Sequence, residues 1–389
     1  MPGTDRLALE INRVVPIKRT ARVMQVEGIF DIPPSAQSKE RWNVLLPLDE
    51  QEWHIGLIQG PSGSGKTTIA REAFGDAYVP EHQWDEHAAV VDGFPASMGA
   101  KEITLLLSSV GFSSPPSWLR PYHVLSTGEQ FRVSLARTLA EYPELAVVDE
   151  FTSVIDRTVA KIGSATVAKA VRRRGGQFVA VTCHPDVEAW LDPDWTYSTA
   201  DHSFAWRVLQ GRPSIKLEIA RVHRSAWQLF AHHHYLTGEH SKVAWCFCGF
   251  IEGTPVTFQS YLSFVGRLGP KGAAGGLHAR RGHRSVTLPD YQGIGVNNAM
   301  KTRLASMWKG MGYRIFRNTG HPAEIAIAKR SPEWVMTRAP SRSGRDSGGF
   351  MTHGDSRYVA SFEYIGEAMP RADAEALFNG ERVGLASVA

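Results

Sequence analysis

The chain has 389 residues, with 43 Lys+Arg, 39 Asp+Glu and three cysteines, and this length allows two domains with separate cores. No apolar run approaches the ~20 residues that a membrane-spanning helix needs, residues 1–6 lack the apolar core of a signal peptide, and three cysteines make no even disulfide framework. These features exclude an integral membrane protein and a disulfide-stabilised secreted protein, and they predict a cytoplasmic location without a membrane partner.

The strand-like apolar segment at residues 55–58 is followed by a glycine-rich loop and then by a helical pattern at residues 68–74. The loop, from Gly60 to Thr67, has the spacing G-x-x-x-x-G-K-[ST]. Glycines let such a loop wrap tightly, its backbone N–H groups face a phosphate, and the following helix N-terminus adds positive potential. We expect Lys66 to reach the β- and γ-phosphates and Thr67 to hold Mg²⁺. The expected nucleotide-binding residues are Gly60, Pro61, Ser62, Gly63, Ser64, Gly65, Lys66, Thr67 and Thr68.

Three further segments follow this loop in a fixed order. The segment Leu125-Ser126-Thr127-Gly128-Glu129-Gln130 is followed by an apolar strand pattern that ends in two carboxylates, and a late histidine, His184, follows another strand. Asp149 at the strand end can hold Mg²⁺, and Glu150 can polarise the attacking water. The order of these motifs, over about residues 20–205, resembles the ABC ATPase family.

The resemblance implies a role for each matching residue. Ser126 and Gly128 would bind the γ-phosphate of an ATP held by a second copy of the chain. Glu150 would be the general base, and His184 would sense the γ-phosphate. The first domain, residues 1–210, is therefore expected to bind ATP and Mg²⁺ and to form a head-to-tail dimer that encloses two ATP molecules.

Two positions depart from the family's pattern or stay open. The glutamine expected after the next strand is replaced by Asp92, if residues 88–91 form that strand, and Gln83 lies earlier than the pattern expects. The aromatic side chain that would stack on adenine is either Phe30 or Trp42.

The second half of the chain differs from the first in charge. Residues 1–210 hold 20 Lys+Arg and 26 Asp+Glu, a net charge of −6, whereas residues 211–389 hold 23 and 13, a net charge of +10, and the two values sum to +4. This asymmetry favours a polyanionic partner for the second half, with DNA preferred. Arg280, Arg281 and Arg284 are expected to lie in flexible basic loops that follow a phosphate backbone, and an ordinary solvated surface is the alternative.

The second half also predicts an alternation of strands and helices, and thus an α/β domain. Helices are expected at residues 223–234 and 298–309, strands at residues 242–249, 255–264, 284–289 and 313–317, and a glycine-rich loop at residues 266–276. A glycine turn, Gln292-Gly293-Ile294-Gly295-Val296, joins the third strand to the second helix. A strand, a glycine turn and a helix again make an anion-binding arrangement.

This glycine turn resembles motif A of the GNAT acyltransferases, in which Q/R-x-x-G-x-G/A holds the pyrophosphate of an acyl-CoA. Gln292 and Gly295 match the motif, whereas Asn297 stands where Gly or Ala is usual. The resemblance implies an acyl-CoA cofactor, with acetyl-CoA expected. The residues expected to bind it are Gln292, Gly293, Ile294, Gly295 and Val296. A plain strand–helix turn, in which the glycines serve geometry alone, is the alternative.

Two histidine-containing segments indicate which branch of the GNAT family the second half resembles. His232-His233-His234-Tyr235 ends the first predicted helix of the domain, and His321-Pro322 follows the strand after the glycine turn. Together with the basic charge, these segments resemble the Mom-like branch of GNAT proteins, over about residues 215–365, which modifies adenine in DNA. The resemblance implies that His234 and Tyr235 form a catalytic proton-transfer pair. His321 could equally cap a helix.

The sequence therefore predicts two α/β domains. Residues 1–210 would form an ABC-type P-loop ATPase, and residues 211–389 a GNAT-like mixed α/β acyltransferase that modifies a nucleobase in DNA. One alternative is a transporter ATPase subunit with an added regulatory domain. Another is a soluble ABC-type ATPase that clamps DNA and carries a non-catalytic C-terminal domain.

Overall fold

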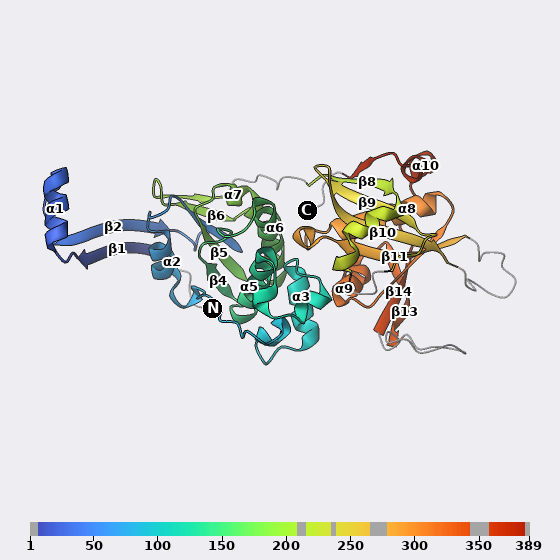
Figure 1. Cartoon of the computed structure of the whole chain (residues 1–389), viewed down its shortest axis with the longest axis horizontal. Helices are drawn as coiled ribbons and strands as arrows, with labels where there is room; N and C mark the ends of the chain where they lie inside the picture. The colour runs from blue at the N-terminus through green and yellow to red at the C-terminus, as the bar shows by residue number, and fades with distance from the viewer. Residues whose placement is uncertain (1–6, 208–214, 235–238, 265–277, 343–357, 386–389) are drawn as a thin grey trace. The chain divides into compact units, whose positions relative to one another are not determined.

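The computed structural model describes residues 7–207, 215–234, 239–264, 278–342 and 358–385 (Figure 1). Tyr235, and the loop expected at residues 266–276, lie outside these described residues. The chain divides into two compact units, each built from separate stretches of sequence. The unit called here the core unit comprises residues 1–81, 142–154 and 171–211, and the composite unit comprises residues 82–141, 155–170 and 212–389.

The core unit is built on a five-stranded sheet with the order β4-β5-β3-β6-β7. The strands are β3 (Ile55–Gln59), β4 (Leu145–Val148), β5 (Gln177–Thr182), β6 (Trp195–Ser198) and β7 (Ser203–Trp206). All neighbours are parallel except β6 and β7. Strands of a parallel sheet are covered on both faces, and this explains the uninterrupted apolar runs of β3 and β5. Its helices include α2 (Lys66–Phe74) and α7 (Asp186–Leu191).

A two-stranded antiparallel ribbon belongs to the same unit. Its strands are β1 (Leu7–Pro16) and β2 (Gln37–Leu46), and α1 (Ala21–Phe30) lies at its far end (Figure 1). Ile11, Val44 and Leu46 join the apolar core of the unit. The helix α1, by contrast, has no buried residue. The ribbon is therefore held to the rest of the core unit by one end.

The first part of the composite unit is a helical segment. It contains α3 (Ala100–Ser109), α4 (Pro115–Trp118), α5 (Thr127–Glu141), the 3₁₀ turns η2 (Val90–Gly93) and η3 (Tyr122–Val124), and most of α6 (Arg157–Arg174). The strand predicted at residues 88–91 is wrong, because Val90 and Val91 lie in the turn η2.

The second part of the composite unit is an eight-stranded sheet with the order β13-β14-β12-β11-β10-β9-β8-β15. The strands are β8 (Leu217–Val222), β9 (Trp245–Ile251), β10 (Thr254–Ser263), β11 (Ala279–Thr287), β12 (Arg314–Thr319), β13 (Trp334–Arg342), β14 (Tyr358–Tyr364) and β15 (Val383–Leu385). The pairs are antiparallel except β11 with β12.

Helices cover this sheet on one face and short turns cover the other. The helices α8 (Val296–Gly310), α9 (Pro322–Arg330) and α10 (Arg371–Asn379) contribute to the larger apolar core, which also includes Ile162 of α6. The turns η4 (Arg224–Leu229) and η5 (Ala231–His233) contribute to a smaller core around Trp227 and Phe258. The helix predicted at residues 223–234 is therefore wrong: these residues form two 3₁₀ turns that break at Phe230.

The structure also tests the membrane prediction in part. None of the helices in the described stretches has the length and apolarity that a bilayer span requires.

Candidate functional site

The predicted phosphate-binding loop follows β3 and leads into α2. Gly65 occupies the N-cap of α2 with φ 87° and ψ 6°, a left-handed conformation that favours glycine. Gly60, with φ 150°, approaches the Thr199 side chain so closely that an added Cβ would lie 2.1 Å from Oγ1. The buried Lys66 folds back and donates a hydrogen bond from Nζ to the Pro61 carbonyl at 2.7 Å. The loop thus presents backbone N–H groups around a lysine that already points into its bend.

Two carboxylates follow β4, as predicted. Asp149 accepts hydrogen bonds from the Tyr78 hydroxyl at 2.8 Å and from the backbone N–H of Glu150 at 2.8 Å. The Glu150 carboxylate accepts a hydrogen bond from Ser153 Oγ at 2.6 Å, and Glu150 itself has a positive φ of 49°. A strained backbone at such a position is common where a side chain must be aimed at a reaction.

Tyr78 is a site residue that the sequence reasoning missed. Burial, together with the hydrogen bond to Asp149, raises the pKa of its hydroxyl, so the group stays a proton donor near neutral pH. The Arg71 guanidinium lies 4.6 Å from the centre of the Tyr78 ring and fixes the ring from the other side. No motif marks this tyrosine, because its role depends on the parallel bridge between Tyr78 and Val147.

His184 follows β5 and lies just beyond the last residues of that strand. Its backbone N–H donates to Thr182 Oγ1 at 3.2 Å, which fixes the turn that carries the imidazole. Because β3, β4 and β5 are neighbouring parallel strands, their carboxyl ends meet at one edge of the sheet. The phosphate-binding loop, the two carboxylates and His184 therefore gather at that edge.

The structure favours one of the two aromatic residues left open for adenine stacking. The Trp42 indole packs on the phosphate-binding loop, where a Cβ at Gly65 would lie 2.8 Å from its ring. Phe30 lies in α1 and is 69% exposed. Trp42 is thus the aromatic side chain placed beside the loop.

The segment predicted to meet a second copy of the chain begins α5. Ser126 and Glu129 form a reciprocal cap: Ser126 N and Oγ each donate to Glu129 Oε2 at 3.0 Å. Glu129 also accepts from Ser117 Oγ at 3.1 Å. This cap fixes Gly128 at a helix N-terminus, where backbone N–H groups suit an anion.

The interpretation of Asp92 as the replacement for the expected glutamine is wrong. The segment that joins the sheet after α2 is Tyr78–Val79, because Val79 N donates to Val147 O at 2.9 Å. Gln83 lies four residues after Val79, and its carbonyl accepts from Arg137 Nη1 at 2.8 Å. Gln83, and not Asp92, is therefore the glutamine that follows the strand-pairing segment.

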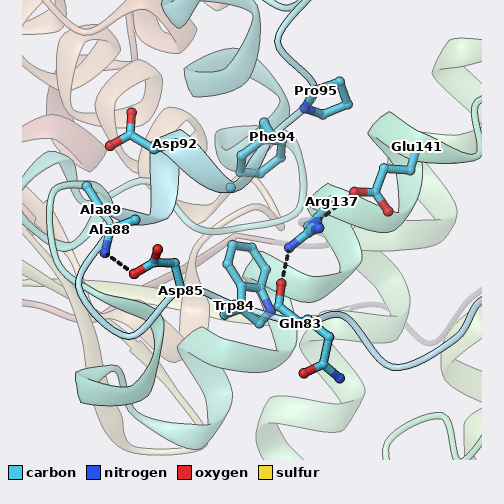
Figure 2. A pocket seen from close by; sticks show the side chains of 11 residues that line it. Gln83, Trp84, Asp85, Ala88, Ala89, Asp92, Phe94, Pro95, Arg137 and Glu141 are labelled. Atoms are coloured by element: carbon cyan, nitrogen blue, oxygen red, sulfur yellow. Dashed lines mark hydrogen bonds and ion pairs between the residues drawn. The ribbon is translucent and has the colours of Figure 1, made fainter.

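Asp92 instead lines an open pocket of about 390 Å³ (Figure 2). Trp84 forms one wall, stacked 4.6 Å from the Tyr122 ring on one side and 4.7 Å from the Arg137 guanidinium on the other. Figure 2 shows Asp85 beside the backbone of Ala88, to which it is hydrogen-bonded at 3.1 Å. The pocket combines an aromatic wall with exposed carboxylates.

The glycine turn before α8 has the predicted geometry. Gly295 is the N-cap with φ 94° and ψ 0°, and Gly293 has φ 88°. The space in front of the turn, however, is filled by the helical segment of the same unit. A Cβ at Gly293 would lie 2.8 Å from the Cα of Gly111, and Gln292 Oε1 accepts from the backbone N–H of Ser113 at 2.7 Å.

Two further contacts fill the turn from other directions. The side-chain oxygen of Asn297, Oδ1, accepts hydrogen bonds from Gln259 Nε2 at 2.6 Å and from Ser285 Oγ at 3.0 Å. Arg132 of α5, which is 1% exposed, donates from Nη2 to Asp290 Oδ1 at 2.9 Å. In this structure the residues predicted to hold the acyl-CoA pyrophosphate make internal contacts instead.

His234 lies in a histidine cluster on the face of the sheet that carries η4 and η5. Its ring lies 5.5 Å from that of Trp227, and the His240 ring lies 5.4 Å from Trp227 on another side. His240 Nε2 lies 3.0 Å from Ser260 Oγ, and His283 Nε2 accepts from the backbone N–H of Ser241 at 3.3 Å.

The cluster is electropositive and favours neutral imidazoles. Burial, with Arg284, His240, Arg281 and His234 nearby, lowers the pKa of His283 to about 4. The stretches that the structure describes contain no group of three His, Cys, Asp or Glu side chains suited to a metal ion. The His283 imidazole therefore stays neutral near neutral pH, and Arg281 and Arg284 supply the positive charge that could meet an anion.

The expectation that Arg280, Arg281 and Arg284 form flexible basic loops is wrong, because all three lie in the strand β11. The Arg280 guanidinium is buried, 3.8 Å from the centre of the Tyr313 ring and 4.5 Å from that of Trp245. Cation–π packing of this kind fixes a guanidinium in the fold. A polyanion site at these residues could use Arg281 and Arg284 but not Arg280.

Comparison with known proteins shows similarity over about a third of the chain. No protein-family model matches the chain. The lipoprotein-releasing system ATP-binding protein LolD of Hyphomonas neptunium is 32% identical over 153 residues, which are 33% of this chain and 65% of that protein. The Fe(3+) ions import ATP-binding protein FbpC of Yersinia pestis bv. Antiqua is 33% identical over 186 residues, which are 37% of this chain and 53% of that protein. The chain thus spans less than two thirds of each relative.

Among solved structures, an ATP-binding cassette bound to ADP and Pi in a dimeric, post-hydrolysis state is 18% identical and covers 44% of this chain and 94% of its own, with a TM-score of 0.36. The loop, the carboxylates and the parallel sheet define a P-loop nucleotide-binding protein. The sequence similarity supports an ABC-type ATPase domain over about a third of the chain.

Proposed function

We propose that the chain is an ATP-hydrolysing ABC-type ATPase that acts on its own C-terminal α/β domain. The observation that carries this proposal is the ion pair between Arg132 of α5 and Asp290, at 2.9 Å. It joins the helix that begins with Ser126 to the turn before α8. The helical segment and the C-terminal sheet therefore belong to one compact unit.

The chemistry of hydrolysis rests on residues of the core unit. Lys66 would bind the β- and γ-phosphates, Thr67 and Asp149 would hold Mg²⁺, and Glu150 would take a proton from the attacking water. Bound Mg²⁺ would neutralise charge on the phosphate oxygens. His184, at the end of β5, would donate a hydrogen bond to the γ-phosphate.

A second copy of the chain would complete each site. Ser126 and Gly128 lie at the capped N-terminus of α5, in a different compact unit from the phosphate-binding loop. The Ser126 N–H and Oγ are held by Glu129 in the single chain, and they would turn to the γ-phosphate of an ATP bound by the partner, at a helix N-terminus that suits an anion. Each ATP would then lie between two chains.

Closure of such a dimer would displace the helical segment, and the C-terminal sheet would follow it. The contacts of Gly111 with Gly293, Ser113 with Gln292, and Arg132 with Asp290 leave little freedom between these two parts. ATP binding and hydrolysis would thus reposition the C-terminal domain without a separate partner protein.

The test is ATP hydrolysis by the purified full chain and by Glu150→Gln. We expect Mg²⁺-dependent hydrolysis that Glu150→Gln abolishes, while ATP drives the variant into a stable dimer detected by light scattering. The matched control is Glu144→Gln, an exposed carboxylate immediately before β4, which should hydrolyse ATP normally. A Glu150→Gln chain that stays monomeric with saturating ATP would contradict the two-chain site.

A second candidate function for the C-terminal domain is acyl transfer from acetyl-CoA to a nucleobase in DNA. The observation that favours it is the place of the glycine turn, between β11 and α8, with β12 returning parallel to β11. β11 and β12 pair only over Ala279–Arg281 and Arg314–Phe316, and acyl-CoA would reach the turn only if the helical segment moved away from it. His234 and Tyr235 would transfer protons.

Acyl-CoA binding tests this candidate. Gly295→Glu should remove acetyl-CoA binding, measured by calorimetry, without changing ATP hydrolysis. Mass spectrometry of nucleosides should show a modified base in cells that carry the wild type and not in cells that carry His234→Ala/Tyr235→Phe. Acetyl-CoA affinity that is unchanged in Gly295→Glu would reject the turn as its site.

A transporter ATPase subunit is the remaining alternative, which the names of the two relatives suggest. It predicts that the chain fractionates with membranes. Recovery of the ATPase entirely in the soluble fraction would oppose it.

A further inference from the structure

A second group of buried charges lies between α8, α9 and β12, away from the glycine turn. It contains Lys301 of α8, Arg317 of β12, and His321 and Glu324 at the start of α9. Arg317 and Lys301 are 7% and 8% exposed. Neither the ATPase site nor the predicted acyltransferase site uses these residues.

Arg317 is held in place by aromatic rings but not by an anion. Its guanidinium lies 4.1 Å from the centre of the Trp334 ring and 5.5 Å from that of Phe362. Its Nε and Nη2 atoms are buried and have no hydrogen-bond partner within the stretches that the structure describes. Burial lowers the pKa of Arg317, with Glu324 and Tyr261 acting against the shift, yet a guanidinium does not lose its proton in a protein.

The one carboxylate of the group is already paired with Lys301. Lys301 Nζ donates to Glu324 Oε1. Burial alone would raise the pKa of Glu324, but Lys301 chiefly, with His321 and Arg317, brings it down to about 2. With one carboxylate and two cations, the group keeps one positive charge uncompensated, and such a charge is costly in a buried place.

His321 adds two more unused polar atoms. Burial lowers the pKa of His321, and its Nδ1 and Nε2 atoms are buried without a hydrogen bond of good geometry within the described residues, although the Ser113 backbone lies close enough to act on the ring. It is the N-cap of the nine-residue helix α9, and its side chain does not cap that helix. Pro322 occupies the first helical position and has no N–H, so the first N–H groups at this helix end are those of Ala323 and Glu324. The centre of the Trp118 ring lies 5.6 Å from that of the imidazole.

We propose that Arg317, His321 and the N-terminus of α9 bind a phosphate group, either as free phosphate or as part of a small nucleotide such as CoA. A guanidinium, an imidazole and helix N–H groups are the usual partners of phosphate oxygens. The phosphate would supply the missing acceptors of Arg317 Nε and Nη2 and the missing negative charge. Because Trp118 belongs to α4, the ligand would also touch the helical segment of the ATPase.

Calorimetry on the full chain tests this site, in the Lys66→Ala background so that the phosphate-binding loop does not contribute. Phosphate, pyrophosphate, CoA and a short DNA oligonucleotide are titrated separately. We expect Arg317→Met to weaken binding of at least one of them tenfold or more. Arg314→Gln is the control, because Arg314 lies in the same strand and forms a half-exposed ion pair with Glu363. This variant should change the affinity less than twofold.

If Arg317→Met does not fold, His321→Asn carries the test, with a loss of threefold or more. Binding of phosphate but not of CoA would identify an inorganic ligand, and much tighter binding of CoA than of phosphate would identify a nucleotide. Either result supports the site. Absence of binding, equal affinities for wild type and Arg317→Met, or binding of an oligonucleotide only would overturn it. ATP hydrolysis is measured separately, in Arg317→Met with Lys66 intact, so that a failure of the phosphate site can be distinguished from a failure of the proposed ATPase function.

Discussion

The chain contains two strand–glycine–helix turns with almost the same backbone, and they differ in what lies in front of them. The N-cap of α2 is Gly65 with φ 87° and ψ 6°, and the N-cap of α8 is Gly295 with φ 94° and ψ 0°. An added Cβ at Gly63, in the first turn, would touch nothing within 4 Å, whereas one at Gly293, in the second, would collide with Gly111. Two residues before the N-cap, the first turn is therefore open at Gly63 and the second is packed at Gly293.

The residue after the N-cap also differs between the two turns, with a cation in the first and an apolar side chain in the second. Lys66 supplies a cation to the first turn, while Val296 is 1% exposed and belongs to the large apolar core. Backbone geometry alone therefore makes an anion site possible, and the side chains and neighbours decide whether the space is used for a ligand or for packing. In the second turn it is used to attach the helical segment.

The largest expected effect concerns the open turn. Lys66→Ala removes the cation that would bind the β- and γ-phosphates, and we expect ATP hydrolysis to fall about 1000-fold, or about 4 kcal/mol of transition-state stabilisation. Steady-state phosphate release measures it. Lys39→Ala, at an exposed position of β2, is the control and should keep its activity. Hydrolysis that survives Lys66→Ala would remove the functional contrast between the turns.

The next effect concerns the ion pair that attaches the packed turn. Asp290→Ala leaves Arg132 buried with no partner, since its Nε and Nη1 atoms already have none among the described residues. Because Asp290 is half-exposed, we expect a loss of about 3 kcal/mol in the free energy of unfolding, at the lower end for a broken buried pair. Urea denaturation measures the loss.

The double variant Arg132→Met/Asp290→Ala is the control for this pair. Replacing both charges removes the unpaired guanidinium, so most of the stability should return. If the double variant is as unstable as Asp290→Ala, the ion pair is not what attaches the turn.

A pair of glycine substitutions compares the turns directly. Alanine at either position adopts a left-handed backbone, which costs about 1 kcal/mol. Gly63→Ala should lose only that, whereas Gly293→Ala should lose about 2 kcal/mol or more, because its Cβ meets Gly111 Cα at 2.8 Å and Thr166 Cγ2 at 2.6 Å. Equal losses in thermal unfolding would mean that the second turn is no more crowded than the first.

The two turns also show what the sequence could predict. The spacing of glycines predicted both backbones, and the apolar runs before Asp149 and before His184 predicted the strands that these residues follow. The crowding of Gly293 could not be predicted, because Gly111 lies far from it in the chain. Local patterns specify turns and strands, whereas contacts between distant segments depend on the packing of whole elements.

Two local predictions failed for a related reason. Residues 88–91 are apolar enough for a strand, but the sheet position is taken by Tyr78–Val79, which pairs with β4. The basic residues at 280–284 predicted a flexible loop, but they form part of the strand β11, and the Arg280 guanidinium packs on the Tyr313 ring. In both places tertiary contacts outweighed the local composition.

The smallest expected effect tests the residue that sequence reasoning missed in the open site. Tyr78→Phe removes the 2.8 Å hydrogen bond to Asp149 and should leave the ring packed beneath Arg71. One hydrogen bond to a carboxylate contributes about 1.5 kcal/mol at the lower end, so the Mg²⁺ concentration for half-maximal hydrolysis should rise about tenfold. Tyr142→Phe, elsewhere in the core unit, is the matched control.

The pH dependence separates positioning from proton transfer. Burial raises the pKa of Tyr78 above its ordinary value of 10.0, so the hydroxyl is protonated throughout the range from about pH 6 to pH 9. A residue that only orients Asp149 should therefore give the same change for Tyr78→Phe at every pH in that range. A change that grows with pH would mean that Tyr78 exchanges a proton during hydrolysis. A constant change would assign Tyr78 to holding the carboxylate of the open site, for which the packed turn has no counterpart.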